Sequence, residues 1–436
     1  MEPRVVIVGG GFGGLKAALA LGHPGRAQVL LLDKRNYHLF QPLLYQVATA
    51  TLNPSDIAVP IRQVLARHRN VSVLMETVLS VDLAGKAVLT DTGSHAYDYL
   101  ILAAGASHSY FGHPEWEELA PGLKTIEQAL EIRRRVLTAF EQAEKETDPA
   151  AQARLLTFVV IGGGPTGVEM AGALAELAHA IVASDFRHLK SELLRVILLQ
   201  GGNRVLPQFA PELSIKAKAA LEKKGVEVRL DKLAKEITPI GVRLDEGMVP
   251  SANIIWAAGV KPAPVNKTLG LPLDREGRVI VAPDLSLPGH PEVFAIGDQA
   301  HFDTPQGPLP GLAPVAMQQG VHAARNIIAE AAGRPRRPFK YLDKGTMAVI
   351  GRNYAVTDFH GLRIGGYIAW LMWLFVHILY LVGFRNRIAV VFNWAWSYLT
   401  FKRGARLITG RGWKENESAP PVAPKPVEAE GAVARA

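Results

Sequence analysis

A glycine-rich stretch that occurs twice constrains the fold of this chain more than any other feature. Residues 159–169, VVIGGGPTGVE, combine a glycine-rich turn with an acid and precede an Ala- and Leu-rich run over 170–178. The N-terminal sequence VVIVGGGFGGLKAALA repeats the pattern. Each copy follows an apolar run and precedes a helical one, so each predicts a strand, a tight turn and a helix.

The glycines of each copy follow the G-x-G-x-x-G spacing of a phosphate-binding turn. In such a turn, backbone N–H groups and the positive end of a helix face a pyrophosphate, and a Cβ at the closest glycine would block the approach. One copy is weak evidence, whereas two copies in the same context predict two dinucleotide sites. The glycines concerned are Gly9, Gly11, Gly14, Gly162, Gly164 and Gly167.

Other residues near the turns are compatible with this prediction. A strand predicted over 28–33 ends in Asp33, at about the separation from Gly11 at which a carboxylate reaches a ribose hydroxyl. The alternative for Asp33 is a solvated strand end. Strands predicted over 97–105 and 253–259 both end in Ala-Ala-Gly, which allows a cofactor to approach closely but is equally common in tight packing.

The chain contains no cysteine among its 436 residues. This absence excludes disulfide scaffolds, thiolate metal sites, iron–sulfur clusters and every cysteine-dependent redox mechanism. Any electron transfer must therefore run through bound organic cofactors, and no metal site is predicted. The length is sufficient for two or three domains with separate cores.

The net charge of +8 is concentrated near the C-terminus. No acid lies between Asp358 and Glu415, whereas eight basic residues lie there and flank two apolar segments. This arrangement favours an anionic membrane surface over nucleic acid as the partner. No signal peptide precedes the first predicted strand, so we expect the body of the protein on the cytoplasmic side of the inner membrane.

The first apolar segment, 364–384, is about 31 Å long as a helix and nominally long enough to span a bilayer, whereas the second, 388–401, is too short. A single span would place the following cations opposite the dinucleotide-binding body, against the positive-inside tendency. We therefore expect two helices in or dipping into one leaflet, or alternatively a buried helix pair or a homodimer interface. Headgroup-level tryptophans would be Trp370, Trp373, Trp394 and Trp396, and a polar stripe would contain Asn393, Ser397 and Thr400.

The remaining segments give coarser predictions. Antiparallel strands are predicted over 71–89, an exposed helix over 124–146, a linker over 148–152 and a helical insertion over 174–194. A strand over 195–200 and a helix over 315–332 follow. Residues 417–436 are rich in Pro, Ala and Glu and are predicted to be disordered.

Four further motifs carry a family resemblance. They are RNYHLFQPLLYQVA (35–48), FAIGD (294–298), LAPVAMQQG (312–320) and the apolar, basic C-terminal segment. With the two turns, they resemble the two-dinucleotide flavoprotein reductases and, among these, the type II NADH:quinone oxidoreductases. The resemblance implies an α/β fold with two Rossmann-like domains: a discontinuous FAD domain (1–115 and 265–335), a helical linker (116–154), an inserted NAD(P)H domain (155–264), a membrane-anchoring domain (336–414) and a disordered tail (415–436).

The resemblance also implies non-covalent FAD, NADH and a membrane quinone as ligands. It assigns to the FAD site Gly9, Gly11, Phe12, Gly13, Gly14, Asp33, Lys34, Val78, Ala104, Gly105, Gly297 and Asp298. It assigns to the nicotinamide dinucleotide Gly162, Gly164, Pro165, Thr166, Gly167, Gln200, Arg204, Ala258, Gly259 and Val260. Ala316, Gln318 and Gln319 would lie beside the isoalloxazine on the quinone side.

The implied catalytic residues are Glu169, Gln318 and Gln319. Glu169 falls in the first turn of its helix and could organise the nicotinamide or relay protons; the alternative is an acid stabilised by the helix N-terminus by about 0.3–1 kcal/mol. Pro314 replaces a glutamine that members often carry, which leaves Gln318 as the main candidate for quinone hydrogen bonding. His377 could contact the quinone or serve as an interfacial anchor.

Gln200 departs from the family pattern, in which many members have Glu. A carboxylate there would accept from the ribose 2′-OH and repel a 2′-phosphate. Gln200, with Arg204 nearby, removes the repulsion, so NADPH should be tolerated better than usual. Alternatives for the whole chain are a soluble ferredoxin or rubredoxin reductase and an FAD-binding redox sensor, whereas the absence of cysteine removes sulfide:quinone and disulfide reductases.

Overall fold

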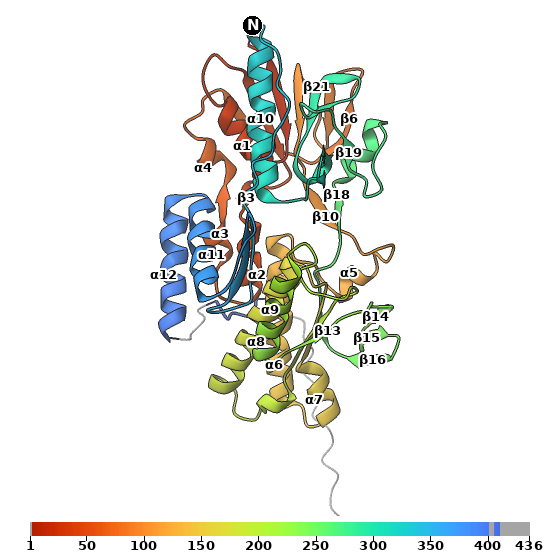
Figure 1. The fold of residues 1–436 in the computed structure, drawn as a ribbon, viewed down its shortest axis with the longest axis vertical. Helices are drawn as coiled ribbons and strands as arrows, with labels where there is room; N and C mark the ends of the chain where they lie inside the picture. The colour runs from red at the N-terminus through yellow and green to blue at the C-terminus, as the bar shows by residue number, and fades with distance from the viewer. Residues whose placement is uncertain (1, 401–404, 410–436) are drawn as a thin grey trace, which may run out of the picture.

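The computed structural model describes residues 2–400 and 405–409. Two α/β lobes follow one another along the long axis of the molecule, and a C-terminal unit with two helices lies beside the second lobe (Figure 1). The predictions for Lys402, Arg403, Arg411 and Lys414 and for the tail from 415 lie outside the described residues.

The first lobe is built on a six-stranded sheet in the order β20-β21-β9-β1-β2-β5. All neighbours are parallel except β20, which runs antiparallel to β21. The strands are β1 (Arg4–Val8), β2 (Gln28–Asp33), β5 (Val71–Met75), β9 (Tyr99–Leu102), β20 (Ser286–Leu287) and β21 (His290–Ala295). Because β21 comes from far along the chain, two separate sequence segments build this lobe.

Helices α1 (Phe12–Leu21) and α10 (Ala313–Ala331) pack against each other beside this sheet (Figure 1). They approach so closely that a Cβ on Gly320 would lie 2.2 Å from the carbonyl oxygen of Gly13. The glycine is therefore required by packing. A meander of β6 (Val78–Asp82), β7 (Ala87–Thr90) and β8 (Ser94–Ala96) completes the lobe.

The second lobe repeats the plan with a four-stranded parallel sheet in the order β13-β12-β11-β17. Its strands are β11 (Thr157–Ile161), β12 (Arg195–Leu199), β13 (Val226–Arg229) and β17 (Asn253–Trp256). Its helices are α6 (Ile126–Lys145), α7 (Pro149–Leu155), α8 (Pro165–Ser184) and α9 (Pro211–Lys223), and its antiparallel meander is β14 (Glu236–Thr238), β15 (Gly241–Leu244) and β16 (Gly247–Pro250). Buried apolar strands such as β11 are typical of parallel sheets covered on both faces.

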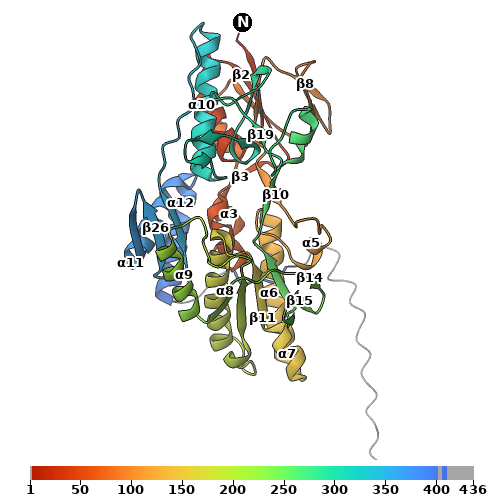
Figure 2. The same cartoon turned by 45° about the vertical axis from the view of Figure 1, so that its right-hand side comes forward.

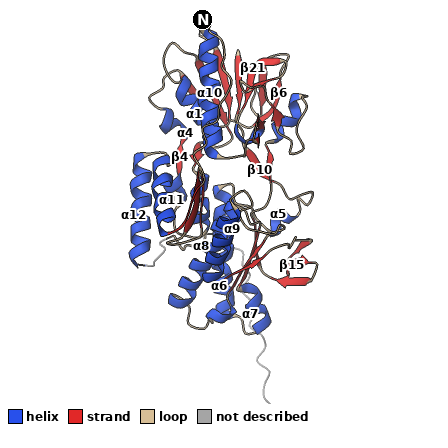
Figure 3. Cartoon of the chain, in the orientation of Figure 1, coloured by secondary structure: helices blue, strands red, loops and turns tan. Residues whose placement is uncertain are grey.

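The C-terminal unit starts with an antiparallel sheet that the sequence analysis did not predict. This sheet contains β25 (Thr346–Val349), β26 (Ala355–Phe359) and β27 (Leu362–Gly366). Helices α11 (Tyr367–Tyr380) and α12 (Phe384–Thr400) follow, and the sheet lies between them and α8 and α9 (Figures 1 and 2). Figure 3 shows the two helices side by side.

Short elements connect these units. The first group is β3 (Tyr37–Leu39), α2 (Leu44–Ala48), α3 (Pro54–Ile57), β4 (Ala58–Pro60) and α4 (Ile61–Leu65). The second group is β10 (Ala106–His108), α5 (Trp116–Leu119), β18 (Val260–Pro262), β19 (Val279–Ile280), β22 (Ala300–His301), β23 (Asp303–Thr304) and β24 (Gly307–Pro308). The pairing of β10 with β18 joins the two lobes.

The predicted bounds of the helix over 364–384 are wrong at both ends. Its first residues belong to β27, which ends at Gly366 with φ 99°, and α11 stops before Gly383, which has φ 91°. The turn at Gly383 leads into α12, which begins earlier than the predicted 388–401 segment. Within the residues that the structure describes, no helix has both the length and the apolar character needed to cross a membrane.

Trp373 contradicts the prediction of four headgroup-level tryptophans. Its side chain is 1% exposed and packs against His377 and Trp394, because it lies on the inner face of α11. Trp396, by contrast, is 54% exposed. The polar stripe of α12 is also partly inward, since Asn393 donates to Asp56 of α3 at 3.2 Å.

Three other predictions need correction. Residues 71–75 form β5 in the parallel sheet rather than a partner of β6, so only 78–90 is an antiparallel hairpin. The predicted linker over 148–152 is helical, because Asp148 caps α7 with hydrogen bonds to two backbone N–H groups. The helix over 126–145 buries one face, and the predicted insertion over 174–194 is mainly the continuation of α8.

Candidate cofactor and substrate sites

The first glycine-rich turn joins β1 to α1. Gly9 has φ 102°, and a Cβ there would lie 2.4 Å from the carbonyl oxygen of Ala103. A Cβ on Gly14 would lie 1.8 Å from the carbonyl oxygen of Gly9. Around Gly11, the N-cap of α1, a Cβ would meet nothing within 4 Å. The turn is thus closed on the protein side and open at the helix N-terminus, as a pyrophosphate cradle requires.

Asp33 lies at the end of β2, directly beside this turn. Its carboxylate accepts hydrogen bonds from the backbone N–H groups of Gly10 at 2.6 Å and Arg35 at 2.7 Å. Burial raises the pKa of the Asp33 carboxyl above its ordinary value, and the two hydrogen bonds oppose that shift. Lys34, the next residue, is exposed. Val78 is the first residue of β6 and lies close to Asp33 in the fold, because the N–H of nearby Glu76 donates to the Asp33 carbonyl oxygen.

The opposite side of the first site is formed by loops that follow β9 and β21. Gly105 and Gly297 both have positive φ, at 69° and 65°. The Gln319 side chain is 1% exposed and accepts from the Gly297 N–H at 2.7 Å, and a Cβ on Gly297 would lie 3.1 Å from the Ala316 Cβ. Gln319 therefore holds the loop that carries Asp298.

Three residues of the first site were missed by sequence reasoning. Gln299 is fully buried, and its oxygen accepts from the N–H of Ala104. Lys124 lies 4.0 Å from Asp298, and burial lowers the pKa of its ammonium. His38 is buried beside Phe12 and contacts the Gly10 carbonyl oxygen. Of these, only His38 lay in a motif that the sequence analysis quoted.

The second turn joins β11 to α8 and has the same backbone geometry. Gly162 has φ 115°, and a Cβ there would lie 2.6 Å from the carbonyl oxygen of Ala257. A Cβ on Gly167 would lie 1.7 Å from the Gly162 carbonyl oxygen. Gly164 is the N-cap of α8, is open on its Cβ side and is followed by Pro165 and the exposed Thr166.

The edge of the second lobe places the remaining predicted residues beside this turn. Ala258 and Gly259 follow β17, Gly259 has φ 69°, and Val260 is 56% exposed. The Gln200 side-chain oxygen accepts from the Gly163 N–H at 2.8 Å. In the first turn, the Asp33 carboxylate accepts the equivalent hydrogen bond from the Gly10 N–H. Arg204 donates to the Pro207 carbonyl oxygen at 2.7 Å, and the loop that holds both contacts the turn through the Leu206 N–H, which donates to the Gly163 carbonyl oxygen.

Glu169 is the fifth residue of α8, so the prediction that it lies in the first helical turn is wrong, and its side chain faces the C-terminal unit. One carboxylate oxygen lies 3.5 Å from the backbone N of Val349, at the end of β25. Burial raises the pKa of Glu169 to about 8. The shift is upward, which is opposite to the shift expected for an anion stabilised by a helix N-terminus.

Gln318 does not present a free amide. Its nitrogen donates to the Leu342 carbonyl oxygen at 2.9 Å, and its oxygen accepts from the Leu342 N–H at 3.0 Å. The side chain thus pins the segment that leads into the C-terminal unit. This pairing argues against Gln318 as the main hydrogen-bonding group for a quinone.

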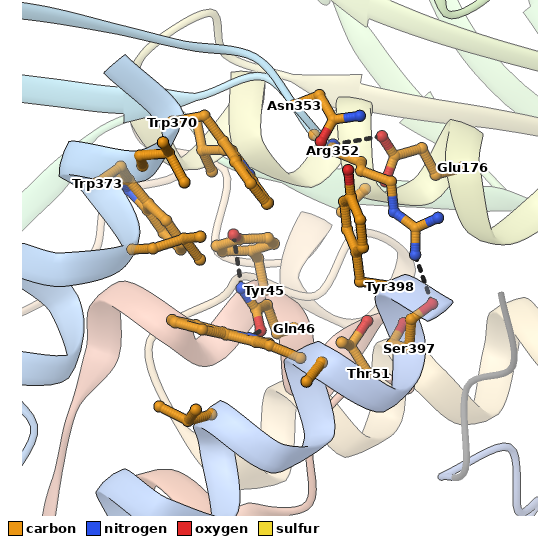
Figure 4. A pocket seen from close by; sticks show the side chains of 18 of the residues that line it. Tyr45, Gln46, Thr51, Glu176, Arg352, Asn353, Trp370, Trp373, Ser397 and Tyr398 are labelled. Atoms are coloured by element: carbon orange, nitrogen blue, oxygen red, sulfur yellow. Dashed lines mark hydrogen bonds between the residues drawn. The ribbon is translucent and has the colours of Figure 1, made fainter. Parts of the chain in front are cut away.

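A cavity of about 1130 Å³, here called the chamber, lies between α2, α8, α11 and α12 (Figure 4). Its walls are mostly apolar and aromatic, and Val349, the neighbour of Glu169, belongs to them. His377 stacks on Trp373, which lines the chamber, with ring centroids 4.0 Å apart, and burial lowers the pKa of His377 to about 4.

Comparisons with known proteins agree with this geometry. Residues 3–320 match the model of the pyridine nucleotide-disulphide oxidoreductase family, and residues 344–403 match the NDH2 C-terminal domain. The chain is similar to two type II NADH:quinone oxidoreductases of Mycobacterium tuberculosis, Ndh and NdhA. Identity to Ndh is 43%, with 99% of this chain and 96% of Ndh covered, and identity to NdhA is 45%, with 94% and 90% covered.

The fold is similar to that of NDH2 from Plasmodium falciparum in complex with NADH. The TM-score is 0.85 at 19% identity, and the match covers 94% of this chain and 100% of that one. The disulphide chemistry in the wider family's name has no counterpart here, because the chain has no cysteine. On the relatives' identity and coverage, the chain belongs to the type II NADH:quinone oxidoreductase family.

Proposed function

We propose that this chain couples the oxidation of NADH to the reduction of a membrane quinone, with non-covalently held FAD between them. The observation that carries the proposal is the presence of two equivalent dinucleotide turns, each closed by backbone contacts and open at a helix N-terminus. FAD, when bound, supplies the capacity to take up two electrons as a hydride and pass them on.

Steady-state NADH oxidation by the detergent-solubilised protein, with a soluble quinone analogue, tests the proposal. Turnover that depends on both substrates is expected. A protein that binds FAD but shows no quinone-dependent turnover would favour the redox sensor, and turnover only with a ferredoxin would favour the soluble reductase.

The residues at the first turn would hold FAD. The backbone N–H groups after Gly11 would face the pyrophosphate, and Asp33 would accept from a ribose hydroxyl. Gln319 and Gln299 would fix the loops around Gly297 and Ala104. We assign 1–115 and 265–335 to this FAD domain and 155–264 to the NAD(P)H domain, and the predicted helical linker, 116–154, supplies helices that pack on the NAD(P)H domain.

Glu169 would organise the nicotinamide or relay a proton between the two substrates. It lies one helical turn beyond the second dinucleotide turn and borders the chamber through Val349. A group with a pKa of about 8 can accept and release a proton at working pH.

Gln200 would permit NADPH as well as NADH. Its oxygen is engaged by the Gly163 N–H, so the end of the side chain that can face a ribose is its NH₂ group, which donates hydrogen bonds. A donor suits a 2′-phosphate, and Arg204 adds a positive charge nearby. A preference for NADH above about a thousandfold in kcat/KM, over about 4 kcal/mol, would contradict this.

We propose that α11 and α12 dock on an anionic membrane surface. Apart from the residues that line the chamber, these helices carry large exposed apolar side chains: Ile368, Leu379, Phe384, Ile388, Phe392 and Trp396. A patch of this size and an adjacent set of basic residues are typical of interfacial helices. The protein would then lie on the cytoplasmic face, with 336–414 as its anchoring domain.

Vesicle flotation tests this docking. Binding should be stronger to anionic than to neutral vesicles, and Phe384→Glu with Phe392→Glu should abolish it, since both rings are over 60% exposed and neither lines the chamber. A different outcome would assign this face to a homodimer interface. In that case the protein would bind neither vesicle type and would form a dimer, and the same substitutions would disrupt the dimer.

A further inference from the structure

Lys124 brings a cation to the first dinucleotide site from a distant part of the chain. It directly precedes Thr125, the N-cap of α6, and its ammonium lies 4.0 Å from the carboxylate of Asp298. The Lys124 side chain is 18% exposed, and no described residue accepts a hydrogen bond from its nitrogen. A mostly buried ammonium with unused donors costs free energy unless water or a ligand accepts from it. The protein itself therefore compensates this charge only in part.

The backbone of Lys124 is fixed on both sides. Its N–H donates to the side-chain oxygen of Gln128 at 3.0 Å, and its carbonyl oxygen accepts from the side-chain nitrogen of Gln41 at 3.0 Å. Gln128 lies in the first turn of α6, whereas Gln41 lies between β3 and α2. The position of the Lys124 backbone is thus set by two separate parts of the chain and needs no bound cofactor.

His108 of β10 is a titratable neighbour of Lys124. Its Nε2 lies 3.1 Å from the Gln128 side-chain oxygen, which also accepts from the Lys124 N–H. Burial, with the positive charge of Lys124, lowers the pKa of His108 to about 4. Because His108 is neutral at working pH, the charges at this place come from Lys124 and Asp298. Their separation of 4.0 Å is too long for a hydrogen bond, so the contact is an ion pair only.

The order of the strands indicates which half of FAD this pair faces. The proposed pyrophosphate cradle follows β1, which lies inside the six-stranded sheet. Asp33, which would accept from the ribose of the adenosine half, ends β2 on one side of β1. Asp298 follows β21 on the other side, beyond β9. With the adenosine toward β2, the flavin half of FAD runs toward β9 and β21, where Lys124 meets Asp298.

We propose that the Lys124 ammonium compensates the negative charge that the flavin gains on reduction and thereby raises the reduction potential of the flavin. This role of Lys124 rests on the proposed function. Transfer of one hydride from NADH to FAD gives NAD⁺ and a reduced flavin with one negative charge, so two electrons and one proton move together. A fixed cation in a partly buried site stabilises that charge and leaves the neutral oxidised ring almost unaffected. A contact with the pyrophosphate is disfavoured, because Asp298 would repel the phosphates.

Lys124→Met tests the proposal in the full-length, FAD-loaded protein, because methionine removes the charge and keeps most of the side-chain volume. The flavin is equilibrated with a reference dye of known potential, without oxygen, NADH or quinone, and the absorbance of both is recorded. The equilibrium should move about tenfold or more toward oxidised flavin, which is a potential lower by about 30 mV for a two-electron couple. Lys124→Arg keeps the charge and should stay within about threefold of wild type.

Lys86→Met is the matched control. Lys86 also belongs to the first lobe and also pairs with a carboxylate, that of Glu292 at 3.3 Å. Glu292, however, lies near the start of β21, whereas Asp298 lies beyond its end. Loss of the Lys86 charge should therefore leave the flavin potential unchanged.

Two results would overturn the proposal. One is the same potential in wild type and in FAD-loaded Lys124→Met. The other is loss of FAD from Lys124→Met, which would make Lys124 a residue that binds the cofactor rather than one that sets its potential. Failure of the proposed function is a separate result, because the potential is measured without either substrate. In that case the potential would still fall in Lys124→Met, while wild type would show no quinone-dependent oxidation of NADH.

Discussion

The two dinucleotide turns are alike in backbone and differ in the side chains around them. The first glycine of each has positive φ, at 102° and 115°, and its N–H donates to a carbonyl oxygen near the end of the neighbouring strand, that of Leu32 or Leu199. The residue that accepts from the next glycine is a carboxylate at Asp33 and an amide at Gln200. The backbone thus determines where glycine is required, and the side chain at the second strand end determines which dinucleotide suits the turn.

A second difference lies on the helices. Lys16 of α1 and Glu169 of α8 occupy equivalent positions, five residues after Gly11 and Gly164. Lys16 is exposed, whereas Glu169 is enclosed by the C-terminal unit. The first turn is also covered by α10, since a Cβ on Gly13 would lie 3.1 Å from the carbonyl oxygen of Ala316 in that helix. The first turn is therefore suited to holding a dinucleotide alone, whereas the second turn also lies beside Glu169, a candidate catalytic residue.

The largest expected effects separate the two turns. Gly9→Val and Gly162→Val each place a side chain against a backbone carbonyl at a positive φ. Gly9→Val should lose FAD, whereas Gly162→Val should keep FAD and lose more than about a hundredfold in kcat/KM for NADH. Absorbance of bound flavin and steady-state kinetics measure both. Gly93→Ala, where a Cβ meets nothing within 4 Å, is the control; equal loss of FAD from both valine variants would contradict the assignment.

Glu169→Gln should change how stability depends on pH. Because burial raises the pKa of Glu169 from 4.5 to about 8, the folded state binds more protons than the unfolded state between these values, and stability falls as pH rises through this window. Between about pH 6 and about pH 9, the wild type should lose about 2 kcal/mol more than the variant. Denaturant unfolding of both proteins at the two pH values measures this. Parallel pH profiles would show that Glu169 is ionised throughout.

Gln200→Glu should restore discrimination against NADPH. The carboxylate can still accept from the Gly163 N–H, so the turn is kept while a negative charge meets the 2′-phosphate. The ratio of kcat/KM for NADH over NADPH should rise about tenfold or more, with the value for NADH nearly unchanged. An unaltered ratio would mean that Gln200 does not face the ribose.

The smallest effects should distinguish two adjacent glutamines. Gln319→Leu leaves the buried Gly297 N–H without its acceptor and should cost about 1–2 kcal/mol of stability and weaken FAD retention. Gln318→Ala removes a more exposed pair with Leu342 and should cost about 0.5 kcal/mol. Thermal unfolding with and without added FAD measures both. A larger cost at Gln318 would reverse the roles assigned here.

The turns could be predicted from sequence because backbone contacts dictate their glycines within a few residues. Gly9, Gly14, Gly162 and Gly167 cannot carry a Cβ, and a spacing pattern records that requirement directly. Asp33 and Gln200 could be predicted for the same reason, since both lie at strand ends next to a turn.

The C-terminal unit could not be predicted in the same way, because hydropathy does not record where a chain turns. Turns with positive φ at Gly366 and Gly383 interrupt a segment whose apolar sequence looks continuous. Hydropathy also cannot distinguish the buried Trp373 from the exposed Trp396, because both are tryptophans in apolar segments. The pairing of Gln318 with Leu342 and that of Trp394 with Gln46 depend on residues distant in sequence. Such contacts appear only when the elements are packed together.

The central claim is that the two turns serve two halves of one electron transfer. The visible absorbance of the flavin in the purified protein, recorded without oxygen, tests it most directly. NADH should bleach the flavin band of wild type but not of Gly162→Val, and a quinone added afterwards should restore it. Flavin that NADH bleaches equally in Gly162→Val, or that a quinone fails to reoxidise, would contradict the account.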